Sequence, residues 1–163
     1  MKIILIRHAS RVQKPELGQD KDLPLTSGGR KEALNLAEQL ATHGLKPAVY
    51  LTSRYAHAVE TADLLRDQVS GTPPRVVPLA MLTPHEEYTL EGIIREAQQH
   101  GCDLDKIDQI GIVLHHPRLN QLLAKLTPRP ESPKAPDFAE AVCLSADSLQ
   151  DFIRAKGKEV RRL

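Results

Sequence analysis

The chain has 163 residues, and its charged side chains balance to a formal net charge of +1. This length predicts a single domain over residues 1–163. The balanced charge excludes a strongly basic nucleic-acid or membrane-surface protein, and the 40% of hydrophobic residues excludes a disordered chain. Cys102 and Cys143 form no CxxC motif, and no apolar run is long enough to span a membrane. We therefore expect a cytoplasmic monomer without nucleic-acid or membrane partners.

The first elements follow clear periodic patterns. Residues 2–7 form a short apolar run without alternation, typical of a strand buried on both faces. Residues 9–24 are polar and predict a loop. From Thr26 to about His43 apolar residues recur at helical spacing, and Gly44 ends this helix.

The next segment predicts a strand, a helix and an edge strand. Residues 47–52 form a second short strand, after which Ser53 is a suitable N-cap for a helix to about Val69. Residues 75–79 have strand composition, and Pro78 restricts that strand to an edge of the sheet.

A capping pattern predicts the third helix. Thr83 is followed by a proline and then by Glu86, which stands where a capping box requires it, so we expect a helix from there to about His100. Residues 109–115 then form an apolar strand, and Pro117 opens a helix to about Leu126.

The C-terminal part is less regular. Four prolines between residues 127 and 137 predict a loop. Residues 139–145 form a last strand and residues 146–156 a last helix, whose basic end at 154–163 we expect to be solvated. The alternation of strands and helices predicts an α/β domain with three layers, a mostly parallel sheet and helices on both faces.

Polar side chains that suit phosphate binding follow three of the predicted strands. Arg7 and His8 follow the first strand, His57 lies just after the second, and His115 follows the strand at 109–115. Ligands bind beyond the carboxyl ends of parallel strands, where a helix N-terminus also favours an anion. Together these residues predict a phosphate site with a possible nucleophile. A metal site on the three histidines is the competing interpretation, and Arg7 disfavours it because its charge would lie beside the metal.

Four segments resemble the histidine phosphatase superfamily. Residues 5–9 (LIRHA) resemble its Arg-His-Gly/Ala motif, and residues 24–33 (PLTSGGRKEA) resemble its PLTxxGxxQA helix start. Residues 53–62 (SRYAHAVETA) resemble SxxxRAxQTA, and residues 113–117 (VLHHP) resemble VGHxP. The short length is most similar to that of the small SixA-type phosphohistidine phosphatases. The resemblance implies a phosphoglycerate mutase-like fold.

The resemblance also implies a mechanism without metal or cofactor. His8 would attack phosphorus and form a phosphohistidine intermediate that water hydrolyses. Arg7 would bind phosphate oxygens, and His115 would stabilise charge on the transferred group. The implied reaction is the removal of phosphate, and phosphohistidine in a partner protein is the expected substrate.

Two departures from the family pattern leave alternatives open. The family's second arginine aligns with His57 and its glutamine with Glu60. A neutral histidine offers less charge and no bidentate fork, so we expect Arg54, His57 or both to contact phosphate. If neither does, the chain is a weak enzyme or a phosphate- or phosphoprotein-binding module. A small-molecule phosphomonoesterase on the same fold is a further alternative.

The general acid has two candidates. The family's acid follows the third strand, which indicates Glu86 or Glu87, and Glu86 is equally suited to capping a helix. Cleavage of an N–P bond needs less help from an acid than cleavage of an ester, because imidazole leaves readily. A missing acid would therefore favour phosphohistidine as the substrate.

Overall fold

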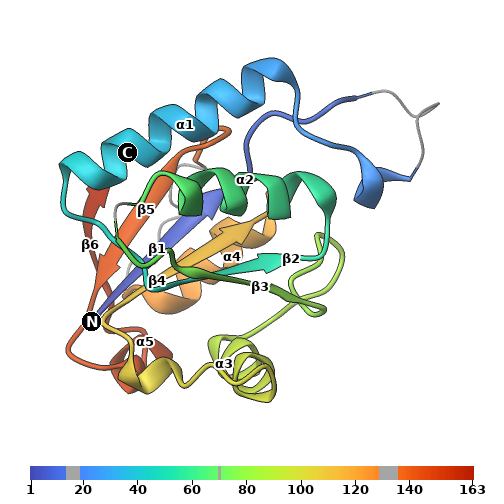
Figure 1. Ribbon diagram of the computed structural model, residues 1–163. Coiled ribbons are helices and arrows are strands. Elements are labelled where there is room, and N and C mark those ends of the chain that lie inside the picture. The colour runs from blue at the N-terminus through green and yellow to red at the C-terminus, as the bar shows by residue number, and fades with distance from the viewer. Residues whose placement is uncertain (14–18, 70, 129–135) are drawn as a thin grey trace.

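The protein is described here by a computed structural model, which covers residues 1–13, 19–69, 71–128 and 136–163. Six strands form one sheet with the order β3-β2-β4-β1-β5-β6 (Figure 1). Their bounds are β1 Lys2–Arg7, β2 Val49–Ser53, β3 Arg75–Leu79, β4 Gln109–Leu114, β5 Ala141–Ser145 and β6 Lys158–Arg162. The helices are α1 Ser27–Thr42, α2 Ala56–Asp67, α3 Leu90–Gln99, α4 Arg118–Leu126 and α5 Leu149–Ile153, with short 3-10 turns η2 Asp20–Asp22 and η3 Leu104–Lys106.

The sheet is mostly parallel, as the alternation of elements predicts. Strands β3, β2, β4 and β1 pair in parallel, whereas β5 pairs antiparallel with β1 and β6 antiparallel with β5. The edge position of β3 agrees with the expectation from Pro78, which lies within it. The predicted α/β fold class is therefore confirmed.

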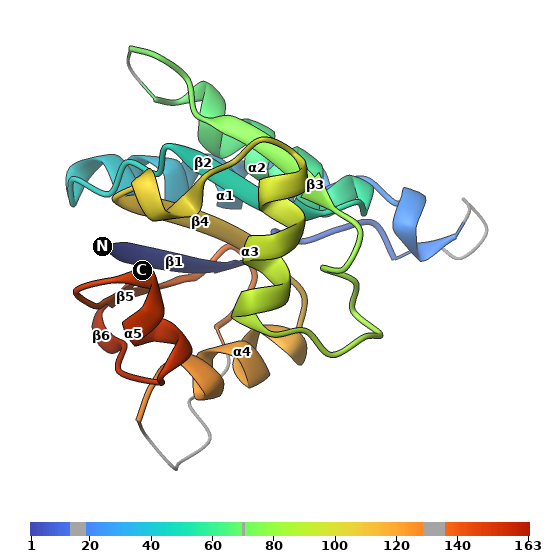
Figure 2. The ribbon, with the colours of Figure 1, turned by 90° about the horizontal axis from the view of Figure 1, so that it is seen from below.

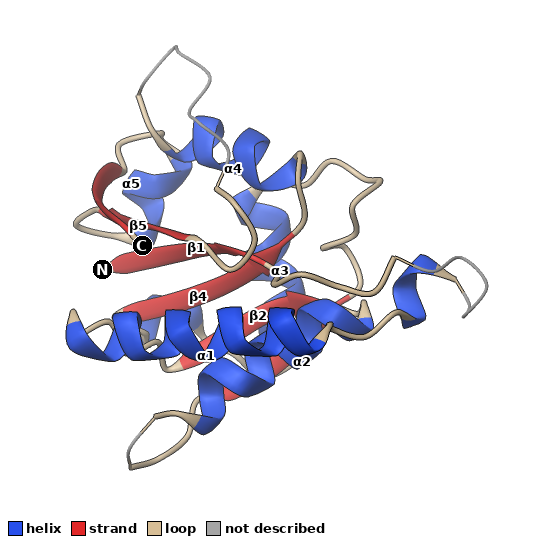
Figure 3. Cartoon of the chain, turned by 90° about the horizontal axis from the view of Figure 1, so that it is seen from above, coloured by secondary structure: helices blue, strands red, loops and turns tan. Residues whose placement is uncertain are grey.

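Two hydrophobic cores lie on opposite faces of the sheet. Along β1, Ile3 and Leu5 face one core, and Ile4 and Ile6 face the other. Helices α1 and α2 cover the second face, and α3, α4 and α5 cover the first (Figures 1, 2 and 3). Burial on both faces explains the continuous apolar runs of β1 and β4.

Two predicted helix starts are wrong. Helix α3 begins at Leu90, where the Thr89 hydroxyl accepts a hydrogen bond from the Gly92 amide at 3.2 Å. The Thr83 hydroxyl does accept from the Glu86 amide at 3.2 Å, yet the chain bends there without becoming helical. Ser53 is the last residue of β2 and does not cap α2, which begins at Ala56 after the N-cap residue Tyr55.

The C-terminal residues also differ from the prediction. The last helix, α5, is short, and residues 158–162 form strand β6 at the sheet edge. Four of the five β6 residues are exposed, so the strand lacks an apolar pattern and gains its order from pairing with β5. Of the predicted loop at 127–137, residues 129–135 lie outside the described part of the chain.

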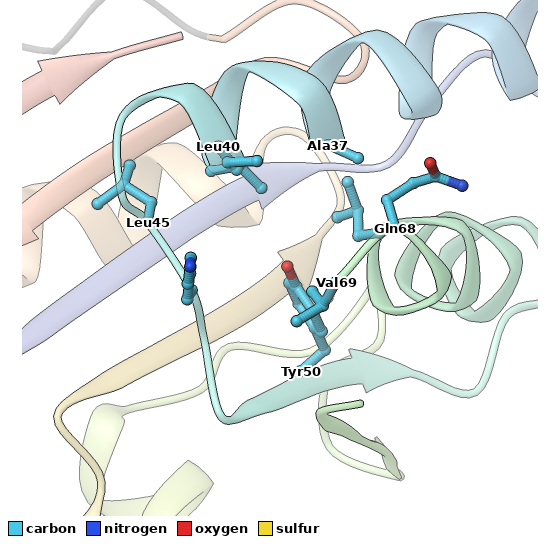
Figure 4. Close-up of a pocket in the computed structure, with 9 residues that line it drawn as sticks. Ala37, Leu40, Leu45, Tyr50, Gln68 and Val69 are labelled. Atoms are coloured by element: carbon cyan, nitrogen blue, oxygen red, sulfur yellow. The ribbon is translucent and has the colours of Figure 1, made fainter. Parts of the chain in front are cut away.

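A cavity lies between α1, α2 and β2, and Figure 4 shows Tyr50 pointing from β2 toward α1 beside it. Leu40 and Leu45 line it near the C-terminal end of α1, and Gln68 and Val69 line it after α2. The cavity therefore lies at the opposite ends of these helices from their N-termini. Among the described residues, no helix has the length and hydropathy needed to cross a membrane.

Candidate functional site

Three histidines meet at the carboxyl ends of adjacent strands. Strand β4 lies between β1 and β2, so His8 after β1 and His115 after β4 are neighbours. His57 lies in the first turn of α2, which follows β2. The ring centroid of His8 lies 4.4 Å from that of His57 and 4.9 Å from that of His115. The ring centroids of His57 and His115 are 5.2 Å apart. The three predicted site histidines thus form one cluster.

The ring of His8 is held in one tautomer. Its Nδ1 lies 2.9 Å from the carbonyl oxygen of Ala9, which can only accept a hydrogen bond. Nδ1 of a neutral His8 therefore carries the proton, and Nε2 carries the lone pair. The Ala9 amide in turn donates to the hydroxyl of Thr61 at 3.1 Å, which ties this loop to α2.

His57 has the same arrangement but is more deeply enclosed. Its Nδ1 donates to the carbonyl of Leu23 at 3.1 Å, and its side chain is 0% exposed. Its Nε2 is buried and has no hydrogen-bond partner among the described residues. This nitrogen therefore presents an unsatisfied lone pair next to His8.

Ser53 orients the third histidine. The Ser53 hydroxyl lies 2.7 Å from Nε2 of His115 and also accepts from the Tyr55 amide at 3.3 Å. The Tyr55 ring meets His115 edge-on with centroids 5.0 Å apart. Ser53 thus has a positioning role at the site in place of the capping role that its sequence context suggests.

Burial keeps the histidines neutral. It is the largest cause that lowers the pKa of His8 to about 3, and nearby His57 and Arg7 lower it further. Burial also moves the pKa of His115 far below its ordinary value, and that of His57 is lowered for the same reason. Each histidine of the cluster therefore offers one ring nitrogen without a proton at neutral pH.

Arg7 lies at the edge of the cluster and stacks on an aromatic ring. Its guanidinium carbon is 4.0 Å from the ring centroid of Phe138, and that ring lies 5.5 Å from the ring of His8. Nη1 donates to the carbonyl of Pro136 at 3.0 Å, and Nε is buried without a described partner. Phe138 lies in none of the sequence motifs, so only the structure shows that it is near Arg7 and His8.

The second cation near the histidines is Arg11 rather than Arg54. Arg54 is exposed and lies in the bend before α2, so it does not share a helical face with His57. Arg11 lowers the pKa of all three histidines through its charge and forms a 2.5 Å ion pair with Asp20. Arg11 lies three residues after His8 in the sequence.

The two glutamates proposed as acids are both exposed. The Glu87 carboxylate lies 3.8 Å from Arg118 and 4.0 Å from Lys125, while Glu86 is held through its backbone. Neither is among the charges that shift the pKa of the cluster, whereas His85 lowers that of His115. His85, which its sequence position suggests to be a surface residue, is thus exposed yet near the site.

A tight approach between α1 and the loop after β1 supports the site. The Glu32 carboxylate accepts from the Ser10 amide and hydroxyl, both at 2.9 Å. A Cβ at Gly29 would lie 2.0 Å from the Ser10 carbonyl oxygen, so a side chain there cannot fit without movement. Glu60 accepts from the Leu25 amide at 2.8 Å and pairs with Arg30, which gives this family-variant position a structural role.

Comparisons with known proteins agree with this geometry. Residues 3–81 match the sequence model of the histidine phosphatase superfamily (branch 1). The whole chain is similar in fold to three solved SixA structures, which are 17%, 19% and 18% identical to it. The protein from Agrobacterium tumefaciens has a TM-score of 0.77 at 17% identity, covering 99% of this chain and 96% of that one.

Two further structures show the same fold. The protein histidine phosphatase SixA complexed with tungstate has a TM-score of 0.76 at 19% identity, covering 100% of this chain and 96% of that one. The SixA protein from Nakamurella multipartitia has a TM-score of 0.75 at 18% identity, covering 99% of this chain and 94% of that one. No curated protein sequence matches the chain significantly. Over residues 3–81 the chain matches the histidine phosphatase superfamily in sequence, and over its whole length it is similar in fold to these SixA structures.

Proposed function

We propose that the protein is a phosphatase that transfers a phosphoryl group to Nε2 of His8. The observation that carries this proposal is the 2.9 Å hydrogen bond from Nδ1 to the Ala9 carbonyl. It leaves the Nε2 lone pair free for attack and holds the ring in one orientation. A pKa of about 3 keeps this nitrogen unprotonated across the physiological range.

The reaction balances over two steps. In the first, the Nε2 lone pair of His8 forms a bond to phosphorus, while the bond from phosphorus to the leaving group breaks and its electrons depart with that group. In the second, water attacks phosphorus and gives up a proton to solvent, the N–P bond breaks with its electrons returning to Nε2 of His8, and inorganic phosphate leaves. Arg7 and Arg11 supply positive charge near His8, and His115 supplies a hydrogen-bonding ring nitrogen.

The proposed substrate is phosphohistidine in a protein. Its leaving group is an imidazole, which requires less protonation than an alkoxide. Among the described residues, neither the Glu86 nor the Glu87 carboxylate forms a hydrogen bond or ion pair with His8, His57 or His115. The tungstate bound to one structural neighbour is an oxyanion of phosphate-like shape, which supports a phosphoryl site in this fold. A small-molecule phosphomonoester is the second candidate substrate.

The alternative is a phosphate-binding module with little activity. His57 favours it, because a neutral imidazole at this position provides neither the charge nor the paired donors of an arginine. In that case phosphate or phosphoprotein would bind without turnover.

One experiment separates these functions. The protein is incubated with an aryl phosphate and, separately, with a phosphohistidine-bearing protein, and phosphate release is measured for wild type and H8N. Faster release from the phosphoprotein, lost in H8N, supports the proposal. Faster release from the aryl phosphate favours the phosphomonoesterase. Phosphate binding without release from either would show the binding module.

We also propose that the protein functions in the cytoplasm as a monomer. Cys102 and Cys143 are both free and buried, which suits a reducing compartment. Light scattering coupled to size-exclusion chromatography tests the monomer, and a dimer mass would contradict it.

A further inference from the structure

The histidine cluster has the chemistry of a metal site as well as that of a phosphate site. One ligand atom from each of His8, His57 and His115 can be chosen so that all three lie within 4.8 Å of one another. Three neutral imidazoles around one point are a common ligand set for Zn²⁺. Tetrahedral bonds of about 2.1 Å set nitrogens about 3.4 Å apart, so the ligand atoms would move toward one another when an ion binds.

We propose that these three histidines bind a divalent transition-metal ion of the Zn²⁺ class, with one ring nitrogen from each as a ligand. The fourth coordination position would remain for water or an anion. This inference goes beyond the proposed phosphatase function and does not depend on it.

The unsatisfied nitrogen of His57 is the strongest argument. A buried polar atom without a partner is costly, and most such atoms in folded proteins are satisfied. Nε2 of His57 is buried and has no partner among the described residues. Because Nδ1 already donates to the Leu23 carbonyl, Nε2 needs a donor or an electron-pair acceptor. A metal ion is an electron-pair acceptor.

Enclosure favours a single-atom ion at this nitrogen. His57 is 0% exposed, whereas His8 and His115 are 6% and 4% exposed. His57 therefore leaves less open surface for a phosphoryl group, which carries three oxygens around phosphorus, than for a single metal ion held between the three rings.

Each histidine also has the outer support that metal ligands require. His8 and His57 donate from Nδ1 to the carbonyls of Ala9 and Leu23, and the Ser53 hydroxyl holds His115. Such outer-shell bonds fix the tautomer and the orientation of a metal-binding imidazole. For His8 and His57 they leave Nε2 as the ligand atom.

The nearby arginines oppose a cation, and carboxylates lie near both of them. Arg7 donates to the Pro136 carbonyl and is under the opposing charges of Asp137 and Glu140. Arg11 is paired with Asp20. The charges of Arg7 and Arg11 still lower the pKa of His8, so the three imidazoles would have to hold the metal against both arginines.

Metal binding would have a direct consequence for the proposed reaction. An ion on Nε2 of His8 would occupy the lone pair that attacks phosphorus. The metal-bound form would therefore be unable to form phosphohistidine on His8, and Zn²⁺ would act as an inhibitor.

Metal binding is tested on the chelator-treated protein without substrate. Calorimetric titration with Zn²⁺ should show one ion per chain, and Co²⁺ should give the visible absorption bands of a four-coordinate site. H57Q and H115Q should each bind at least about 100-fold more weakly, since a lost ligand costs at least as much as a lost outer-shell partner. H100Q, which removes an exposed histidine, should bind as the wild type does.

Three results would overturn the proposal. They are no stoichiometric binding by the wild type, equal binding by folded H57Q and H115Q, or loss of binding in H100Q. Circular dichroism of each variant identifies failure to fold, and the use of two ligand variants keeps the test valid if one of them unfolds. Because binding is measured without substrate, an inactive phosphatase would not affect the result.

Discussion

The rings of His8 and His57 lie with their centroids 4.4 Å apart, so residue 57 directly adjoins the nucleophile that we propose. The resemblance to the superfamily places an arginine at this position. The imidazole of His57 therefore replaces a permanent charge with a neutral group beside His8.

An arginine at position 57 should raise the phosphatase activity. We expect H57R to increase kcat/KM for an aryl phosphate by about 10-fold or more, because it adds paired donors and charge where the transition state is anionic. H57K is the matched control and should gain less, since lysine lacks the fork. A folded H57R with unchanged or lower kcat/KM would show that His57 contributes in its own right.

Arg11 should matter more for oxyanion binding than Arg54. Its charge reaches all three histidines, whereas Arg54 is exposed before α2. We expect R11A to weaken vanadate binding by about 10-fold and R54A by less than about twofold. D20N breaks the same ion pair but keeps the guanidinium, so it should bind nearly as the wild type does. If R54A weakened vanadate binding more than R11A does, Arg54 would be the more important arginine for oxyanion binding.

The contact at Gly29 should be sensitive to one methyl group. In G29A the added Cβ would meet the Ser10 carbonyl oxygen, and the helix or the loop must shift. We expect a loss of about 1–3 kcal/mol in the free energy of unfolding, measured in urea, together with reduced activity. G28A is the control, because its Cβ would lie 3.7 Å from the Thr26 hydroxyl, an ordinary contact. Equal stability of the two variants would contradict this account.

Acid should destabilise the protein through its buried histidines. The unfolded chain protonates His8 near pH 6.5, but the folded state does so near a pKa of about 3. The unfolded state therefore binds more protons between these values, and the free energy of unfolding falls as the pH falls through that window. Each such histidine contributes about 1.4 kcal/mol per pH unit. The stabilisation is fully present above pH 6.5.

Denaturant unfolding of the metal-free protein between pH 4.5 and 6 measures this slope. H115Q should have a slope smaller by about 1.4 kcal/mol per pH unit, because the pKa of His115 also lies far below its ordinary value. H100Q should keep the wild-type slope. A slope in H115Q equal to that of the wild type would show that His115 is protonated in the folded state.

The sheet and its site were largely predictable from local patterns. Apolar runs at 2–7 and 109–115 indicate two buried strands, and the rule that ligands lie at strand carboxyl ends predicts that His8 and His115 converge. In the structure these two strands, β1 and β4, pair in parallel. These features depend on the order of residue types along the chain, which the sequence contains.

The errors arise where distant residues override local signals. The capping pattern at Thr83 does not start a helix, and Arg118 donates to the carbonyls of Pro84 and His85 in that turn. Strand β6 depends on its pairing with β5, and the charged sequence of β6 does not predict that pairing. The stacking of Arg7 on Phe138 likewise joins residues that are far apart in the chain.

The central claim is that Nε2 of His8 accepts the phosphoryl group, and the most direct test is the identity of the phosphoenzyme. The protein is mixed briefly with a phosphohistidine-bearing protein and quenched in alkaline denaturant, and ³¹P NMR with mass spectrometry locates the phosphate. We predict the Nε2-phosphorylated isomer on His8 and no phosphoenzyme in H8N. Phosphate on another residue, or on Nδ1 of His8, would contradict the account, as would turnover that persists in H8N.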